Sequence, residues 1–131
     1  MAKIIIIDDD ALIRRMVSRV LNDAGHEVLE AKNGDAGLSE IRAQAPDLVI
    51  TDLLMPDKEG IEMIRELRGA AHPVPILVIS GSGPADMQAL FLDMALKLGA
   101  SASLGKPFRA AELLAAVDGL LPPASPATRR T

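Results

Sequence analysis

The chain has 131 residues, which is enough for one domain of ordinary size but too short for two. Hydrophobic residues make up 49% of it, so a sizeable core can form, although Phe91 and Phe108 are the only aromatic residues. The net charge of −4 argues against a general nucleic-acid binder, and the scarcity of aromatic rings argues against stacking on single-stranded bases. The absence of cysteine excludes disulfides and thiolate metal sites. We find no apolar run long enough to span a membrane and no signal peptide, and we therefore expect a cytoplasmic protein with no membrane or nucleic-acid partner.

Short apolar runs, rich in β-branched residues, alternate along the chain with segments of helical periodicity. The predicted strands cover residues 4–7, 27–31, 48–51, 76–79 and 102–104. The predicted helices cover residues 11–24, 33–44, 57–68, 84 to about 98, and 109–121. This (βα)5 order predicts an α/β protein with a doubly wound, five-stranded parallel sheet and helices on both faces. Residues 122–131 are rich in proline and small residues and are predicted to be a disordered tail, which leaves a folded domain over residues 1–121.

Apolar residues recur at helical spacing within the predicted helices. In the first helix they are Leu12, Ile13, Met16, Val17, Val20 and Leu21. In the fourth helix, Met87 and Met94 are separated by a helical repeat and are expected to fill the core. Two isolated histidines, His26 and His72, have no partner at a metal-ligand spacing, so they are interpreted as loop residues.

Polar residues follow four of the five predicted strands. Asp8 and Asp9 follow the first strand, Asp52 the third, Ser80 the fourth and Lys106 the fifth. The carboxyl ends of parallel strands meet at one edge of the sheet, where open α/β proteins place their ligands. Mg²⁺ prefers oxygen ligands and commonly takes one or two carboxylates together with phosphate oxygens. The pattern therefore predicts a site for Mg²⁺ and a phosphoryl group at this edge.

Each of these residues also has an ordinary structural interpretation. Asp10, just before the first helix, is expected to cap it, and one acidic neighbour could simply favour the positive end of that helix. Asp52 could begin a turn, and Lys106 alone could be a solvated surface lysine. Three carboxylates at one edge would, however, repel one another and raise one another's pKa unless a cation is bound. A carboxylate in such a site can also act as a nucleophile that forms an aspartyl phosphate.

Four segments together resemble a known family. They are Ile4-Ile5-Ile6-Ile7-Asp8-Asp9-Asp10, Asp47-Leu48-Val49-Ile50-Thr51-Asp52-Leu53-Leu54-Met55-Pro56, Pro75-Ile76-Leu77-Val78-Ile79-Ser80-Gly81, and Gly99-Ala100 with Gly105-Lys106-Pro107-Phe108. In this order and spacing they resemble the CheY-like receiver domain of two-component response regulators, over roughly residues 2 to 121. The resemblance implies a flavodoxin-like fold with strand order 2-1-3-4-5.

The resemblance also implies a metal-dependent phosphoacceptor. Asp52 would accept a phosphoryl group from the phosphohistidine of a histidine kinase. Asp9 would bind Mg²⁺ directly and Asp8 mainly through water, with Asp52 and the backbone carbonyl of Leu54 as further ligands. Mn²⁺ is expected to substitute for Mg²⁺.

Other residues would respond to the phosphoryl group. Lys106 would pair with Asp52 and then with the phosphate, Ser80 would be the switch hydroxyl, and Gly81 would leave room for phosphate access. The family often has an aromatic residue where this chain has Ser103. A serine cannot report the switch by burying a ring, so the usual coupling between site and output surface is expected to differ.

The function expected from these features is that of a single-domain response regulator in a phosphorelay. Its partners would be a histidine kinase or phosphotransfer protein and a downstream target protein, bound through the fourth helix, fifth strand and fifth helix. It would not be an enzyme beyond promoting its own phosphorylation and dephosphorylation. One alternative is a receiver-like binding module that works without phosphate. A second is a Mg²⁺-dependent phosphohydrolase, for which Asp8-Asp9-Asp10 supplies an Asp-x-Asp pair but 131 residues leave no room for a cap domain.

Overall fold

The computed structural model describes residues 2–53, 60–81 and 85–121. Its strands are β1 (Lys3–Ile7), β2 (Glu27–Ala31), β3 (Leu48–Asp52), β4 (Ile76–Ser80) and β5 (Ala102–Gly105). Its helices are α1 (Ala11–Asp23), α2 (Gly34–Gln44), α3 (Gly60–Gly69), α4 (Ala85–Leu98) and α5 (Ala110–Leu120). The five strands form one parallel sheet in the order β2-β1-β3-β4-β5, which confirms the predicted fold class. The predicted tail, residues 57–59 of the predicted third helix and the carbonyl of Leu54 lie outside the described residues.

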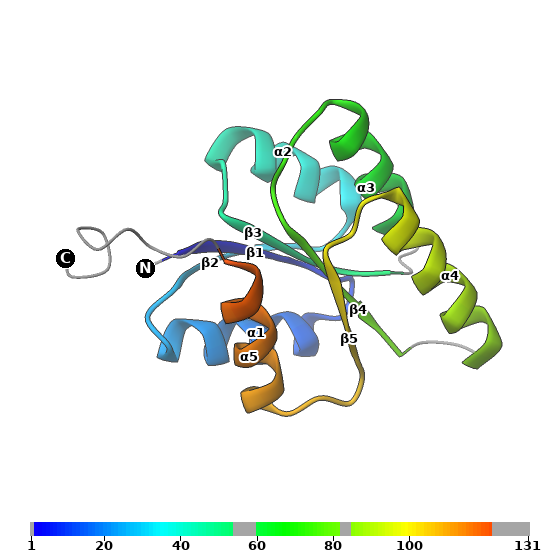
Figure 1. Ribbon diagram of the computed structural model, residues 1–131. Coiled ribbons are helices and arrows are strands. Elements are labelled where there is room, and N and C mark those ends of the chain that lie inside the picture. The colour runs from blue at the N-terminus through cyan, green and yellow to red at the C-terminus, as the bar shows by residue number, and fades with distance from the viewer. Residues whose placement is uncertain (1, 54–59, 82–84, 122–131) are drawn as a thin grey trace.

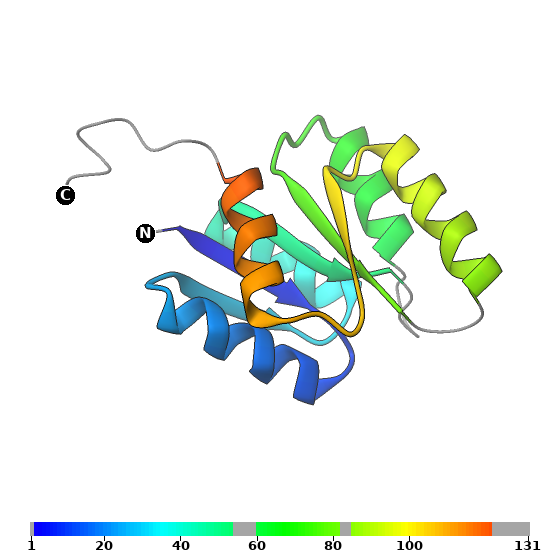
Figure 2. The same ribbon diagram turned by 60° about the horizontal axis from the view of Figure 1, so that its bottom comes forward.

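Helices cover both faces of the sheet, and each face has its own core. α1 and α5 lie on one face, whereas α2, α3 and α4 lie on the other (Figures 1 and 2). Along β1, Ile4 and Ile6 pack on the α1 and α5 face, and Ile5 and Ile7 pack on the opposite face. Successive side chains of a strand point to opposite faces, so a strand covered on both faces needs an unbroken apolar run.

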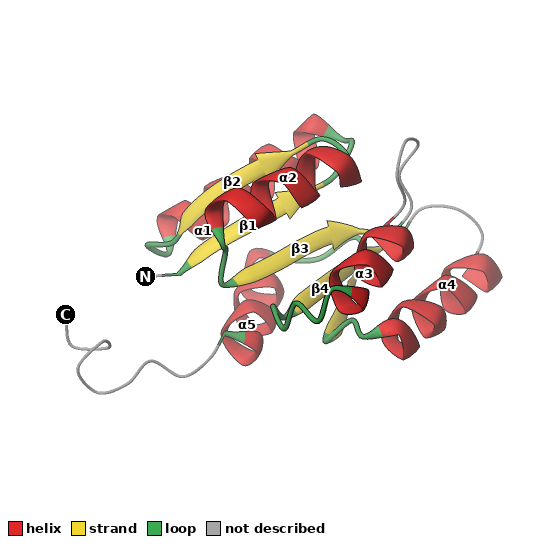
Figure 3. Cartoon of the chain, turned by 90° about the horizontal axis from the view of Figure 1, so that it is seen from above, coloured by secondary structure: helices red, strands yellow, loops and turns green. Residues whose placement is uncertain are grey.

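The register brings the carboxyl ends of the strands to one edge. Ile7 pairs with Thr51 and Asp52 pairs with Ile79. Ser80 pairs with Gly105 in the last ladder. All neighbouring strands pair in parallel, as the arrows of β1, β2 and β3 in Figure 3 illustrate, so the residues at the carboxyl ends of β1, β3 and β5 gather at this edge.

Local sequence signals account for the loops around that edge. Asp10 caps α1, and its Oδ1 accepts a hydrogen bond from the Leu12 N–H at 2.9 Å, as expected. Gly60 begins α3 where the chain passes Asp52 closely, because its N–H donates to the Leu53 carbonyl at 3.0 Å and a Cβ there would collide with the Asp52 carbonyl. A glycine at this point therefore lets α3 start directly beneath the end of β3.

Four residues of the apolar helical patterns are exposed, including the two methionines that were expected to fill the core. Leu12 is 72% exposed and Met16 39%, while Met87 and Met94 on α4 are 44% and 36% exposed. The expectation that Met87 and Met94 fill the core is therefore wrong. With 3.6 residues per turn, Leu12 lies about 140° around α1 from the buried Val17, and both α4 methionines lie about 80–100° from the buried Ala95. On both helices the apolar residues therefore extend around a wider part of the helix surface than the part that packs against the sheet.

The two histidines take the loop positions expected of them. Nδ1 of His26 accepts the Ala2 N–H at 3.3 Å, and Nδ1 of His72 accepts the Val74 N–H at 3.4 Å. None of the described helices has the length and apolarity required to cross a membrane.

Candidate functional site

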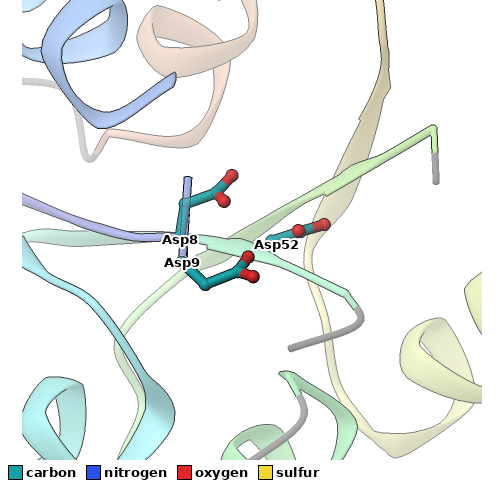
Figure 4. Close-up of side chains that lie close together, drawn as sticks. All are labelled: Asp8, Asp9 and Asp52. Atoms are coloured by element: carbon teal, nitrogen blue, oxygen red, sulfur yellow. The ribbon is translucent and has the colours of Figure 1, made fainter. Parts of the chain in front are cut away.

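Three carboxylates meet at the carboxyl edge of the sheet. Asp52 is the last residue of β3, and Asp8 and Asp9 follow β1 directly. One carboxylate oxygen from each of them lies within 4.8 Å of the other two. Figure 4 shows the three side chains converging from two strand ends. Asp8 is fully buried and Asp52 is 4% exposed, whereas Asp9 faces solvent.

A lysine ammonium completes the cluster. Nζ of Lys106 lies 3.5 Å from Asp8 Oδ2 and 3.8 Å from Asp52 Oδ2. The predicted pairing of Lys106 with Asp52 is present, but the closer carboxylate is Asp8. The other oxygen of each buried carboxylate accepts a backbone hydrogen bond. The Asp10 N–H donates to Asp8 Oδ1 at 2.9 Å, and the Leu53 N–H donates to Asp52 Oδ1 at 2.8 Å. Lys106 is thus a bridge between two buried carboxylates and not a solvated surface lysine.

Burial sets the protonation behaviour of the site. It raises the pKa of Asp52 to about 6, and the neighbouring Asp8 charge adds to the rise, while Lys106 and the Leu53 N–H oppose it. Burial likewise raises the pKa of Asp8, against the opposing effect of the Asp10 N–H and Lys106. A carboxylate with a strongly raised pKa, such as Asp52, at the ligand-binding edge of an α/β sheet is typical of a functional site.

The raised pKa of Asp52 predicts how the stability of the fold depends on pH. Between the ordinary pKa of 3.8 and the folded value of about 6, the folded protein holds the Asp52 proton more tightly than the unfolded chain does. The Asp52 contribution therefore favours folding below about pH 4 and is lost as the pH rises through 6, by about 3 kcal/mol in all. Asp52→Asn should be more stable than wild type by about 1 kcal/mol at pH 4.5 and by about 3 kcal/mol at pH 7.5.

Denaturant titrations followed by circular dichroism, in chelator to remove divalent ions, would measure this difference. Other acidic groups titrate in both proteins. The pH dependence of the difference in unfolding free energy between variant and wild type therefore isolates the contribution of Asp52. A gap between variant and wild type that stays constant from pH 4.5 to 7.5 would contradict the assigned pKa.

The donor set fits a small, hard divalent cation. It consists of carboxylate oxygens, two of them on buried residues and one on a residue open to solvent, so an ion could keep part of its water shell on the Asp9 side. A cation there would also relieve the repulsion that raises the carboxylate pKa values. The carbonyl of Leu54, expected to be a further ligand, lies outside the described residues.

Ser80 and Gly81, at the end of the neighbouring strand β4 and directly after it, both lie close to Lys106. Ser80 ends β4 and is half-buried, and its carbonyl accepts the Lys106 N–H at 2.6 Å. At Gly81, where φ is 158°, an added Cβ would approach the Lys106 Cβ to 2.5 Å. The space at Gly81 therefore admits the lysine stem, a role that the sequence did not indicate. Ser103 is exposed on β5, where the family often has a ring.

An open hollow of about 300 Å³ leads from solvent to the lysine. Its walls come from α1, the end of β4 and the loop after β5, and the lining residues are Ile13, Met16, Gly81, Lys106, Pro107 and Phe108. The walls are mostly apolar, so Lys106 is the charged group that a molecule entering this hollow meets.

The fold and the site together define a class: doubly wound α/β proteins that place carboxylates and a lysine at the carboxyl edge of a five-stranded parallel sheet. The family model for the response regulator receiver domain matches residues 4–118, and the chain belongs to this family. The predicted family and fold are both confirmed.

Several relatives agree with this assignment. Response regulator MprA of Mycobacterium tuberculosis strain H37Ra is 35% identical over 119 residues, which cover 91% of this chain and 50% of MprA. A probable transcriptional regulatory protein of Picosynechococcus sp. is 36% identical over 127 residues, covering 92% of this chain and 49% of that protein. This chain thus spans about half the length of these relatives.

Solved structures show the same fold. Chemotaxis protein CheY4 of Vibrio cholerae superposes with a TM-score of 0.82 and 32% identity, covering 92% of this chain and 99% of that one. NtrX of Brucella abortus gives a TM-score of 0.83 and 30% identity, covering 92% of this chain and 27% of NtrX. The fold therefore occurs both as nearly a whole chain and as part of a longer one.

Proposed function

We propose that this chain is a phosphorylation-dependent signalling switch. Asp52 accepts a phosphoryl group from the phosphohistidine of a histidine kinase or phosphotransfer protein, with Mg²⁺ held by Asp8, Asp9 and Asp52. The observation that carries the proposal is the geometry at Asp52, a buried carboxylate within reach of two other carboxylates and 3.8 Å from a lysine ammonium. A carboxylate placed only to begin a turn needs none of these neighbours.

In the proposed reaction an Asp52 oxygen attacks phosphorus, the bond between phosphorus and the imidazole nitrogen breaks, and the donor histidine departs. With a pKa of about 6, Asp52 is mostly ionised at neutral pH and is available as the nucleophile. Mg²⁺ supplies positive charge to the phosphoryl oxygens. Lys106 lies where its ammonium can move from the carboxylates to a phosphoryl oxygen, which stabilises the charge that moves during transfer.

We infer that the output is contact with another protein. α4 exposes Met87, Leu90 and Met94 at spacings of three and four residues, which form an apolar stripe along the helix. Exposed apolar stripes are typical of surfaces that bind proteins. On this proposal the chain turns over only its own phosphoryl group and is not a conventional enzyme.

Acetyl phosphate tests the proposal directly. The wild-type chain, incubated with acetyl phosphate and Mg²⁺ and measured by intact mass, is expected to gain one phosphoryl group, and chelation of Mg²⁺ should prevent the gain. Absence of an adduct, together with no binding of beryllofluoride, would instead favour a binding module that works without phosphate. Sustained release of phosphate from small organic phosphates would favour the hydrolase.

A further inference from the structure

Arg14 connects helix α1 to the backbone of Asp8 and to strand β2. It lies on α1, and its Nη1 donates a hydrogen bond of 2.7 Å to the backbone carbonyl of Asp8. Its Nε lies 3.4 Å from Oε1 of Glu30 on β2. The arginine side chain is 19% exposed, so it is largely enclosed while it makes both contacts. A planar guanidinium contacts its two partners through separate nitrogens in a rigid geometry, whereas an ammonium is a point charge on a flexible stem.

The carbonyl that Arg14 holds belongs to the peptide between Asp8 and Asp9. A peptide unit is planar, so fixing its oxygen also fixes the orientation of the Asp9 N–H. Only the φ angle and the side-chain torsions of Asp9 then remain to place its carboxylate. The position of the Asp9 carboxylate is therefore tied to a hydrogen bond made one residue earlier in the chain.

The three carboxylates differ in how they are held. Those of Asp8 and Asp52 each accept a backbone N–H and face Lys106. The Asp9 carboxylate is exposed and makes no hydrogen bond with the part of the chain that the structure describes. Of the three, Asp9 relies most on its backbone for position.

We propose that Arg14 is a positioning residue, which holds the Asp8–Asp9 peptide so that the Asp9 carboxylate is set for a divalent cation. Glu30 in turn fixes the guanidinium. This inference rests on the metal site of the proposed function. Groups that orient metal ligands without touching the metal typically change its affinity by about 10- to 100-fold when they are removed.

The sign of the effect separates positioning from simple electrostatics. Arg14 is a cation, so if its charge alone acted on the site, its removal would strengthen the binding of a second cation. Loss of a positioning contact has the opposite effect and weakens binding. The two explanations thus predict changes in opposite directions for the same substitution.

Titration calorimetry with Mg²⁺, in the absence of a phosphodonor, measures the effect. The chain contains no tryptophan or tyrosine, so intrinsic fluorescence offers no convenient signal. Arg14→Met is expected to raise the Mg²⁺ dissociation constant about tenfold. The matched control is Arg15→Met, which removes an exposed arginine from the next position of the same helix. The control is expected to bind Mg²⁺ as wild type does, or slightly more tightly.

Two further variants keep the test decisive if Arg14→Met fails to fold. Arg14→Lys keeps the charge but lacks the rigid pair of nitrogens that contact Asp8 and Glu30, and it should weaken Mg²⁺ binding by about threefold or more. Glu30→Gln should have little additional effect in an Arg14→Lys background, since Glu30 acts through Arg14. Wild-type or tighter Mg²⁺ affinity in folded Arg14 variants would overturn the role of Arg14. Absence of Mg²⁺ binding by the wild-type chain would instead overturn the proposed metal site itself.

Discussion

Replacing Asp52 with asparagine is expected to abolish the phosphoryl adduct that forms with acetyl phosphate and Mg²⁺. The amide has nearly the same shape as the carboxylate and can still accept the Leu53 N–H at 2.8 Å, so the end of β3 should be unchanged. It is, however, neutral and too weak a nucleophile to attack phosphorus. Intact-mass measurement of the adduct over time would show the loss, which should be complete and not a slowing.

Asp10→Asn provides the matched control for this loss. It removes another carboxylate from the same edge of the sheet, but asparagine caps a helix about as well as aspartate does, so α1 should keep its N-cap. The control is expected to be phosphorylated within about twofold of the wild-type rate, because Asp10 is not among the clustered carboxylates. Adduct formation at the wild-type rate by Asp52→Asn would show that another residue is the phosphoacceptor.

The strands and the edge of the sheet could be predicted because both follow from the order of residues along the chain. A buried parallel strand needs an apolar run, and residues 4–7 and 48–51 are such runs, so Asp8 and Asp52 had to lie at the ends of strands. The order of the strands does not follow from those runs. The strand order was implied by the resemblance to the receiver family, and the observed pairing of the strands confirms it.

What could not be predicted depends on side-chain packing. The apolar pattern of α1 includes Leu12 and Met16, but only the neighbouring elements decide how much of that arc is covered, and both residues are exposed. Nζ of Lys106 lies 3.5 Å from Asp8 Oδ2 and 3.8 Å from Asp52 Oδ2, and no sequence pattern encodes which carboxylate is closer. Arg14 is one of several basic residues in the first helix, and nothing in the sequence separates it from Arg15.

Lys106→Met is expected to weaken both the fold and the reaction. Methionine keeps much of the apolar stem that packs beside Gly81 but removes the charge between Asp8 and Asp52. Removing one partner of a buried ion pair leaves the other uncompensated, so the free energy of unfolding at pH 7.5 should fall by about 3 kcal/mol. The initial rate of phosphorylation should fall by about 100-fold, because a charge aimed at the transferred group is lost.

Lys97→Met is the matched control, and added Mg²⁺ makes the test specific. Lys97 pairs with Asp93 on the surface of α4, and its side chain is 76% exposed, so its removal should cost less than about 1 kcal/mol.

If the cost of Lys106→Met comes from two unneutralised carboxylates, a divalent cation bound between them should restore more stability to this variant than to wild type. Denaturant titrations with and without Mg²⁺ would measure that difference. Equal stabilisation of both proteins by Mg²⁺, with phosphorylation unchanged, would mean that Lys106 neither neutralises the site nor takes part in transfer.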